Sequence, residues 1–71
     1  MERIPVASSN VASVGYDSDA NVMEVEFHRS GIYQYFGVPP DVHEGLMTAG
    51  SKGRFFDQYV KKAGYPCARV G

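Results

Sequence analysis

The stretch VMEVEFHRSGIYQYFGVPP, residues 22–40, decides the fold, because it holds two strand patterns, the turn between them and the break that follows. In its first part Met, Val and Phe alternate with Glu and His, which is the period-two pattern of a half-buried strand. The second part is rich in aromatic and β-branched residues, and a glycine and two prolines end it. We therefore predict two antiparallel strands, over 22–28 and 32–38, with a turn at HRSG.

The turn between these strands determines which side chains of the second strand face the core. If Gly31 takes a left-handed position in a three-residue loop, Phe27 lies across from Tyr33 and Val25 lies across from Tyr35. Both tyrosines are then on the core side. The alternative register places the glutamine between them in the core, where its amide would need buried partners. The sequence favours the first register.

A further strand is predicted on the amino-terminal side. The segment NVASVGYD, residues 10–17, alternates so that Ala12, Val14 and Tyr16 share one side. The segment DSDAN that follows is rich in turn formers and lacks the later acidic ligand of a calcium loop. We therefore predict a three-stranded antiparallel meander that spans roughly residues 10–37.

Two helices are predicted on the carboxyl-terminal side. Pro39 and Pro40 suit a helix start, and Gly50 stops that helix. Ser51 can cap a second helix over 52–63, whose apolar side chains recur at helical spacing. These side chains are Phe55, Phe56, Tyr59, Val60 and Ala63. A sheet with two short helices packed on one face is an α+β fold, and the last residues, PCARVG, form a tail or a short edge strand.

The predicted core contains apolar residues from both the predicted strands and the predicted helices. A chain of 71 residues forms one domain, residues 1–71, and a domain of this size buries only about 60% of the surface that its unfolded chain exposes. The core is therefore small. The side chains expected to be most buried are Val14, Val25, Tyr35, Leu46, Phe56 and Val60.

Composition limits the possible functions. Seven basic and eight acidic residues give a net charge of −1, which argues against nucleic-acid binding through bulk charge. Cys67, the single cysteine, cannot form a disulfide within the chain, and with two histidines it cannot supply a four-ligand zinc site. We expect no cofactor and no metal. No segment approaches the ~20 apolar residues of a membrane span, so the expected location is cytoplasmic, without membrane binding.

Basic residues concentrate in the final third of the chain. Lys52 and Arg54 lie in the first turn of the second predicted helix, where free backbone amides and the helix dipole favour an anion. With Lys61, Lys62 and Arg69 they form a candidate phosphate-contacting strip. The alternative is that this is an ordinary solvent-facing helix face, in which the carboxylate at position 57 and the lysine at position 61 form an i, i+4 pair.

The sequence offers less support for other kinds of site. Tyr33 and Tyr35 form a Tyr-x-Tyr motif that either stacks nucleic-acid bases or fills the core with its rings. Neither histidine nor the cysteine is paired with a carboxylate or hydroxyl at a spacing that is diagnostic of catalysis. We therefore predict that the chain has no catalytic residues and is not an enzyme.

Several blocks occur together in an order that resembles the KTSC domain family. They are SSNVASVGYD at 8–17, MEVEF at 23–27, IYQYFGVP at 32–39, SKGRFFDQYV at 51–60 and the Tyr-Pro pair at 65–66. The family is named for its occurrence at the carboxyl terminus of some lysyl-tRNA synthetases, and its signature is a central Tyr-x-Tyr. The resemblance covers nearly the whole chain, and the synthetase context implies RNA binding.

Two functions remain open at the level of sequence. The first is RNA binding through the basic helix face. The second is a protein–protein interaction, with a partner protein or a second copy of the chain, through an apolar patch at Ile32 and Phe36. The two functions use different faces of the predicted sheet and helix layers, so they can be distinguished experimentally.

Overall fold

Five strands form one antiparallel sheet in chain order, from β1 at one edge to β5 at the other. The computed structural model describes all residues 1–71. The strands are β1 (Ile4–Pro5), β2 (Val11–Asp17), β3 (Val22–Phe27), β4 (Gly31–Phe36) and β5 (Cys67–Arg69). The predicted meander is confirmed for β2, β3 and β4. The prediction of a three-stranded meander was too narrow, because β1 and β5 add short edges to the sheet. The short edge strand that was one alternative for PCARVG is confirmed by β5, whereas β1 is too brief to show an alternating pattern.

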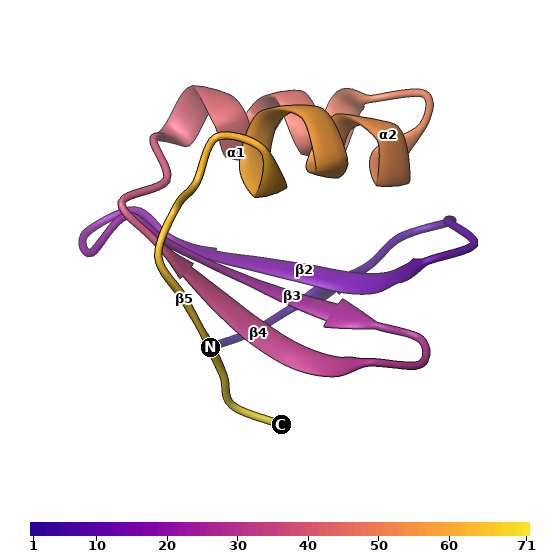
Figure 1. Cartoon of the computed structure of the whole chain (residues 1–71), viewed down its shortest axis with the longest axis horizontal. Coiled ribbons are helices and arrows are strands. Elements are labelled where there is room, and N and C mark those ends of the chain that lie inside the picture. The colour runs from indigo at the N-terminus through magenta and orange to yellow at the C-terminus, as the bar shows by residue number, and fades with distance from the viewer.

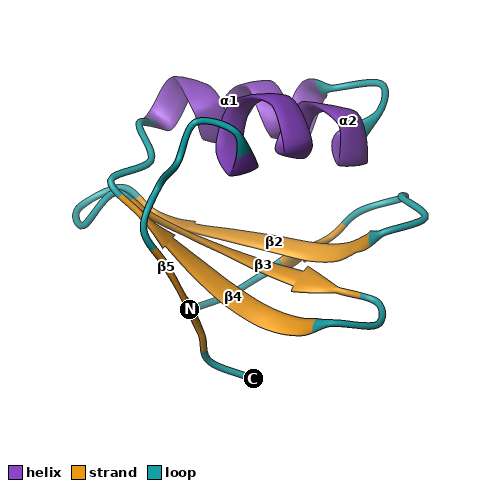
Figure 2. Ribbon diagram, in the orientation of Figure 1, coloured by secondary structure: helices purple, strands orange, loops and turns teal.

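The helices all lie on one face of this sheet, so the α+β architecture is confirmed (Figures 1 and 2). Helix α1 (Pro40–Thr48) begins after Pro39, as predicted. Helix α2 (Lys52–Phe56) continues into a π-helical turn, η1 (Asp57–Lys61). The Ser51 hydroxyl accepts a hydrogen bond from the Arg54 amide at 3.4 Å, which is the predicted cap. None of the helices combines the length and the hydropathy of a membrane span.

The β3–β4 turn has the predicted length and glycine conformation but a different pairing. Its loop has three residues, and Gly31 has a φ of +99°. Val25 pairs with Tyr33 and Met23 pairs with Tyr35, so the predicted register was displaced by two residues. A three-residue loop pairs the last residue of β3 with Gly31 itself, which accounts for the displacement. Because a shift of two residues preserves the side, both tyrosines still face the helices.

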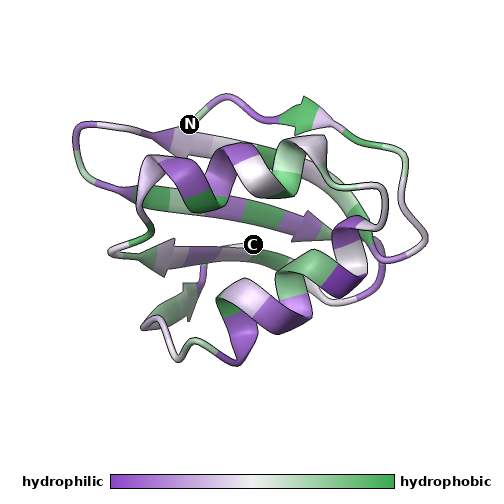
Figure 3. Ribbon diagram, turned by 90° about the horizontal axis from the view of Figure 1, so that it is seen from above, coloured by the Kyte–Doolittle hydropathy of each residue, from purple (hydrophilic) through white to green (hydrophobic).

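The core lies between the sheet and the helix layer. Its buried side chains are Val11, Val14, Met23, Val25, Val38, Leu46, Phe56 and Val60. Five of the six residues predicted to be most buried are among them. Tyr35 is the exception, because its ring is only partly covered and packs at the margin of the core. From above, the two helices lie side by side over the sheet (Figure 3).

The sheet face away from the helices carries a polar network that holds the amino-terminal segment. The Arg3 guanidinium donates to the Ser13 hydroxyl at 2.9 Å and forms an ion pair with Glu24. Ser13 donates in turn to Glu26, and Gln34 donates to Glu24 at 2.9 Å. Every buried side-chain nitrogen and oxygen has a hydrogen-bond partner. The buried charge is therefore compensated.

Glu24 in this network is buried, with only 6% of the residue exposed. Burial is the largest single influence on it and acts to raise its pKa, but hydrogen bonds from Gln34 and Arg3, together with the positive charges of Arg3 and the amino terminus, outweigh burial. The pKa of Glu24 therefore lies below its ordinary value. The ionised form is the one that the fold stabilises.

Candidate functional site: an aromatic cleft beside a basic helix

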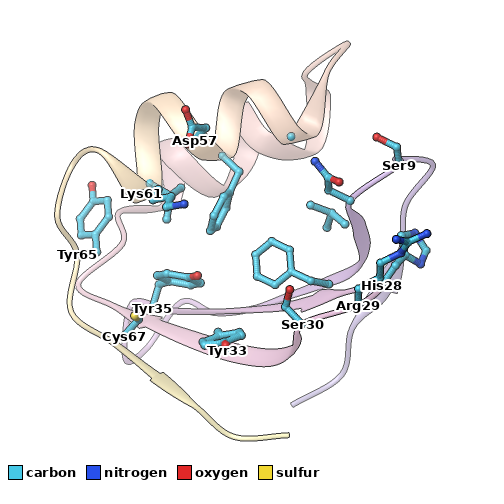
Figure 4. Close-up of a pocket in the computed structure, with 16 residues that line it drawn as sticks. Ser9, His28, Arg29, Ser30, Tyr33, Tyr35, Asp57, Lys61, Tyr65 and Cys67 are labelled. Atoms are coloured by element: carbon cyan, nitrogen blue, oxygen red, sulfur yellow. The ribbon is translucent and has the colours of Figure 1, made fainter.

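A cleft of about 900 Å³ runs between the helix layer and strands β3 to β5 (Figure 4). The family-motif residues Tyr33 and Tyr35 lie on its sheet side, and Tyr65 lies at the end near Cys67 (Figure 4). Its other lining side chains include two phenylalanines, Phe27 and Phe56. The cleft is thus the place where aromatic side chains of the sheet, the helix and the carboxyl-terminal segment meet.

The aromatic rings of the cleft support one another by edge-to-face packing. Phe56 packs against both Phe27 and Tyr35 with ring centroids 5.2 Å apart and planes at 75°. Phe27 also packs against Tyr33, with centroids 5.9 Å apart. Such T-shaped pairs are the favourable arrangement for aromatic rings. The tyrosine rings therefore contact core side chains and also line the cleft.

The Tyr35 phenol is kept in its neutral form. Burial raises the pKa of Tyr35 to about 12, and the neighbouring Cys67 thiol and Tyr33 phenol act in the same direction. The hydroxyl therefore stays protonated at physiological pH and can both donate and accept a hydrogen bond.

The π-helical turn gives Lys61 and Lys62 different surroundings. The Lys62 amide donates to the Asp57 carbonyl at 3.0 Å, five residues back, and its ammonium lies 3.7 Å from the Asp57 carboxylate. The predicted pairing of Asp57 with Lys61 was therefore wrong, because an i, i+5 turn places position 62 beside position 57. Lys61 instead lines the cleft, close to Tyr35 and Tyr65 in the view of Figure 4.

Positive charge predominates around the cleft. Arg29 and Lys61 line it from the β3–β4 turn and from η1. Arg69 is the cross-strand partner of Tyr33, so both side chains leave the same face of the sheet. The only acidic side chain in the lining is Asp57, which pairs with a lysine. Arg29 was not among the predicted site residues, because a single arginine in a turn gives no signal at the level of sequence.

The five basic residues of the predicted strip are divided among three places. Lys52 and Arg54 line a second hollow of about 560 Å³ with mostly polar walls, and the Lys52 ammonium donates to the Ala49 carbonyl at 3.1 Å. Lys61 and Lys62 lie at the end of η1. Arg69 is exposed on β5 and donates to the Gly71 carbonyl at 3.0 Å. The side chains share the helix side of the molecule but do not form one continuous row.

The residues of the alternative apolar patch lie on the opposite face of the sheet. Ile32 and Phe36 alternate with the two tyrosines along β4 and therefore point away from the helices. Ile32 is partly covered by Gly71, and a Cβ on that glycine would come within 2.9 Å of the isoleucine Cδ1. Phe36 is 37% exposed.

Other groups of potential chemical interest are dispersed. His28 lies in the β3–β4 turn and contacts the Ser8 carbonyl at 3.0 Å. His43 on α1 stacks on Tyr16, with ring centroids 4.5 Å apart and planes at 8°. No group of three or more His, Cys, Asp or Glu side chains is arranged to hold a metal ion.

Comparisons with known proteins agree with the fold. The sequence profile of the KTSC domain matches residues 7–65. A solved KTSC domain protein from Yersinia pestis is 46% identical, with a TM-score of 0.94 over 99% of this chain and 97% of that one.

Two relatives differ in how much of their own length this chain matches. An uncharacterised protein of Stutzerimonas stutzeri is 40% identical over 70 residues, which are 99% of each chain. The lysine–tRNA ligase of Nostoc punctiforme is 36% identical over 53 residues, which are 75% of this chain and 9% of that protein. These matches confirm the resemblance given by the sequence blocks around the Tyr-x-Tyr motif, and the chain belongs to the KTSC domain family.

Proposed function

We propose that the chain binds single-stranded RNA through the basic side chains on its helix side. The observation that carries this proposal is the separation of charge along the chain. Five of the seven basic residues lie between positions 52 and 69, together with only one of the eight acidic residues, Asp57. Such an uneven distribution can attract a phosphate backbone although the net charge is −1.

The environment of four of the five cations supports the same function. Arg54, Lys61, Lys62 and Arg69 are exposed, and Lys62 alone among them has a carboxylate partner. The carboxylates of Glu24 and Glu26 lie on the opposite face of the sheet, within the polar network. A strand that passes over α2 and η1 therefore meets few repulsive charges. A related segment also occurs in a lysine–tRNA ligase, a protein named for a tRNA.

A chemical-shift titration with a short single-stranded RNA, at low and at physiological salt, tests the proposal. Binding should shift the amide resonances of residues 51–62 and weaken as salt is added, because phosphate contacts release counterions. The double variant Arg54→Glu with Lys61→Glu should lose binding while its melting temperature changes little, since both side chains are exposed. Unshifted resonances at low salt, or unchanged affinity of the double variant, would exclude the proposed function.

A further inference from the structure

The cleft has features that a phosphate-contacting surface alone does not require. Its floor is aromatic, its volume of about 900 Å³ lies in the range of small-ligand sites, and it opens beside the basic side chains of η1. Backbone contacts to RNA need only exposed cations. The aromatic floor therefore suits a ligand with an apolar or aromatic part in addition to a phosphate.

We infer that the cleft binds one unstacked nucleobase of the RNA strand against Tyr33 and Tyr35, with Lys61 at the adjoining phosphate. This inference rests on the proposed function and assigns a substrate subsite to it. Aromatic side chains hold single-stranded bases by stacking, and every base has a π-face, so the site would tolerate different sequences. A base paired within a duplex could not enter the cleft, because both of its faces and its pairing edge are occupied.

Charge complementarity selects a nucleotide over an apolar peptide segment as the occupant. Arg29 and Lys61 contribute two cations to the lining, while the single acidic side chain, Asp57, forms a surface ion pair with Lys62. Arg69 adds a third cation on the face that carries Tyr33. An aromatic floor with cations around it fits a ligand that has a flat ring and an anionic group.

The π-helical turn provides a matched pair of lysines for the test. Lys61 and Lys62 are adjacent in sequence and both are exposed, but only Lys61 lines the cleft, whereas Lys62 pairs with Asp57. Lys61→Gln and Lys62→Gln change the net charge equally. If Lys61 contacts the phosphate of the bound nucleotide, Lys61→Gln should weaken RNA binding more than Lys62→Gln does.

The tyrosines allow a similar comparison. Tyr33→Ala should lower the affinity for oligouridine by about 5- to 150-fold, the range expected when one base loses its stacking partner. Tyr33→Phe keeps the ring and should bind as the natural chain does. Tyr59→Ala is the control, because Tyr59 is 54% exposed and packs on Phe55 outside the cleft. The melting temperature of each variant shows whether a loss of affinity reflects unfolding.

The single cysteine gives a readout that requires no substitution. Cys67 is exposed and lines the cleft, so an occupant of the cleft should slow its alkylation. The probes are a short oligouridine and an abasic oligomer of the same length, which keeps the phosphates and lacks the bases. We expect oligouridine to slow the alkylation of Cys67 and to shift the ring resonances of Tyr33 and Tyr35. The abasic oligomer should bind more weakly and do neither.

Two other outcomes separate this inference from the proposed function. If oligouridine shifts residues 51–62 but leaves Cys67 alkylation and the tyrosine rings unchanged, the strand binds without the cleft, and the inference is overturned while the proposed function stands. If neither oligomer binds at low salt, both are overturned. Equal protection of Cys67 by the two oligomers would show that no base enters the cleft and would also overturn the inference.

Discussion

Phe56 packs the helix layer against two aromatic rings of the sheet. It is 7% exposed, and its ring packs on Phe27 and Tyr35 at 5.2 Å. Phe56→Ala should therefore cost about 3–5 kcal/mol, from lost burial and the cavity left behind. That is a large part of the stability of a small domain. Urea unfolding followed by circular dichroism measures this cost, and Tyr59→Ala should change stability by less than about 1 kcal/mol. A near-normal melt of Phe56→Ala would contradict its place in the core.

Glu24 makes the stability of the fold fall as the pH becomes acidic. Its pKa in the folded chain is below its ordinary value of 4.5, so the carboxylate stabilises the fold above that pH, and this stabilisation is lost as the pH falls through the folded pKa. Glu24→Gln should lower stability at neutral pH and flatten the further loss on acidification.

The measurement that checks the role of Glu24 is the urea midpoint at neutral pH and at about pH 3. Glu44→Gln, at an exposed position on α1, is the control and should leave the acid-dependent loss as large as in the natural chain. An equally steep loss in Glu24→Gln would assign the acid sensitivity to other carboxyls.

The β3–β4 turn and the carboxyl-terminal segment both depend on Gly31. Gly31 has a φ of +99°, and a Cβ there would lie 2.5 Å from the Gly71 carbonyl oxygen. Gly31→Ala should therefore cost about 1–3 kcal/mol in backbone strain and displace the carboxyl-terminal segment as well. The Val70 amide, which donates to the Ile32 carbonyl at 2.8 Å, should lose protection against hydrogen exchange.

Gly37→Ala distinguishes backbone strain from the steric conflict with the Gly71 carbonyl. Gly37 also has a positive φ, of +79°, but nothing lies within 4 Å of the space that a Cβ would occupy. This variant should show the backbone strain alone and keep the Val70 amide protected. If both variants cost the same and both keep that protection, Gly31 does not hold the carboxyl-terminal segment in place.

Strands and helices with a repeating hydrophobic pattern could be predicted from the sequence. Elements that exist only because of their contacts with distant parts of the chain could not. The alternation in β3 identifies the side that faces the helices, because one face of the strand carries Glu and the other carries Met and Val. It did not predict that Glu24, on the opposite face, is also buried. In contrast, β1 has two residues and β5 has three, so neither shows a period. Regular helical spacing also predicted the wrong partner for Asp57, because the local sequence DQYVK does not distinguish an i, i+5 turn from an i, i+4 turn.

The cleft was missed for a related reason. Its lining comes from the start of β2 and the segment before it, the end of β3, the turn that follows it, β4, the α2–η1 helix and the carboxyl-terminal segment. No short stretch of sequence contains these residues together. The family motif pointed to Tyr33 and Tyr35, but whether they belonged to the core or to a binding site depended on how far the helix layer covers β4. The structure places them at the margin of that cover.

For the whole molecule, the question is whether the affinity for RNA depends on where the basic residues lie or only on the net charge. If all five basic residues between positions 52 and 69 neutralise a phosphate, the logarithm of affinity should fall with the logarithm of salt at a slope of about −3.5. Arg54→Gln should reduce that slope by about 0.7, because one phosphate contact is lost.

Ser18→Glu provides the comparison, because it changes the net charge by the same amount as Arg54→Gln in the exposed turn between β2 and β3. Both variants can be titrated with a labelled oligouridine over a series of salt concentrations. A charge far from the bound strand alters the overall potential but releases no counterion from the RNA, so Ser18→Glu should keep the slope of the natural chain. Equal slopes for the two variants, both smaller than that of the natural chain, would mean that net charge governs binding. The basic helix side would then have no special role, although it holds five of the seven cations.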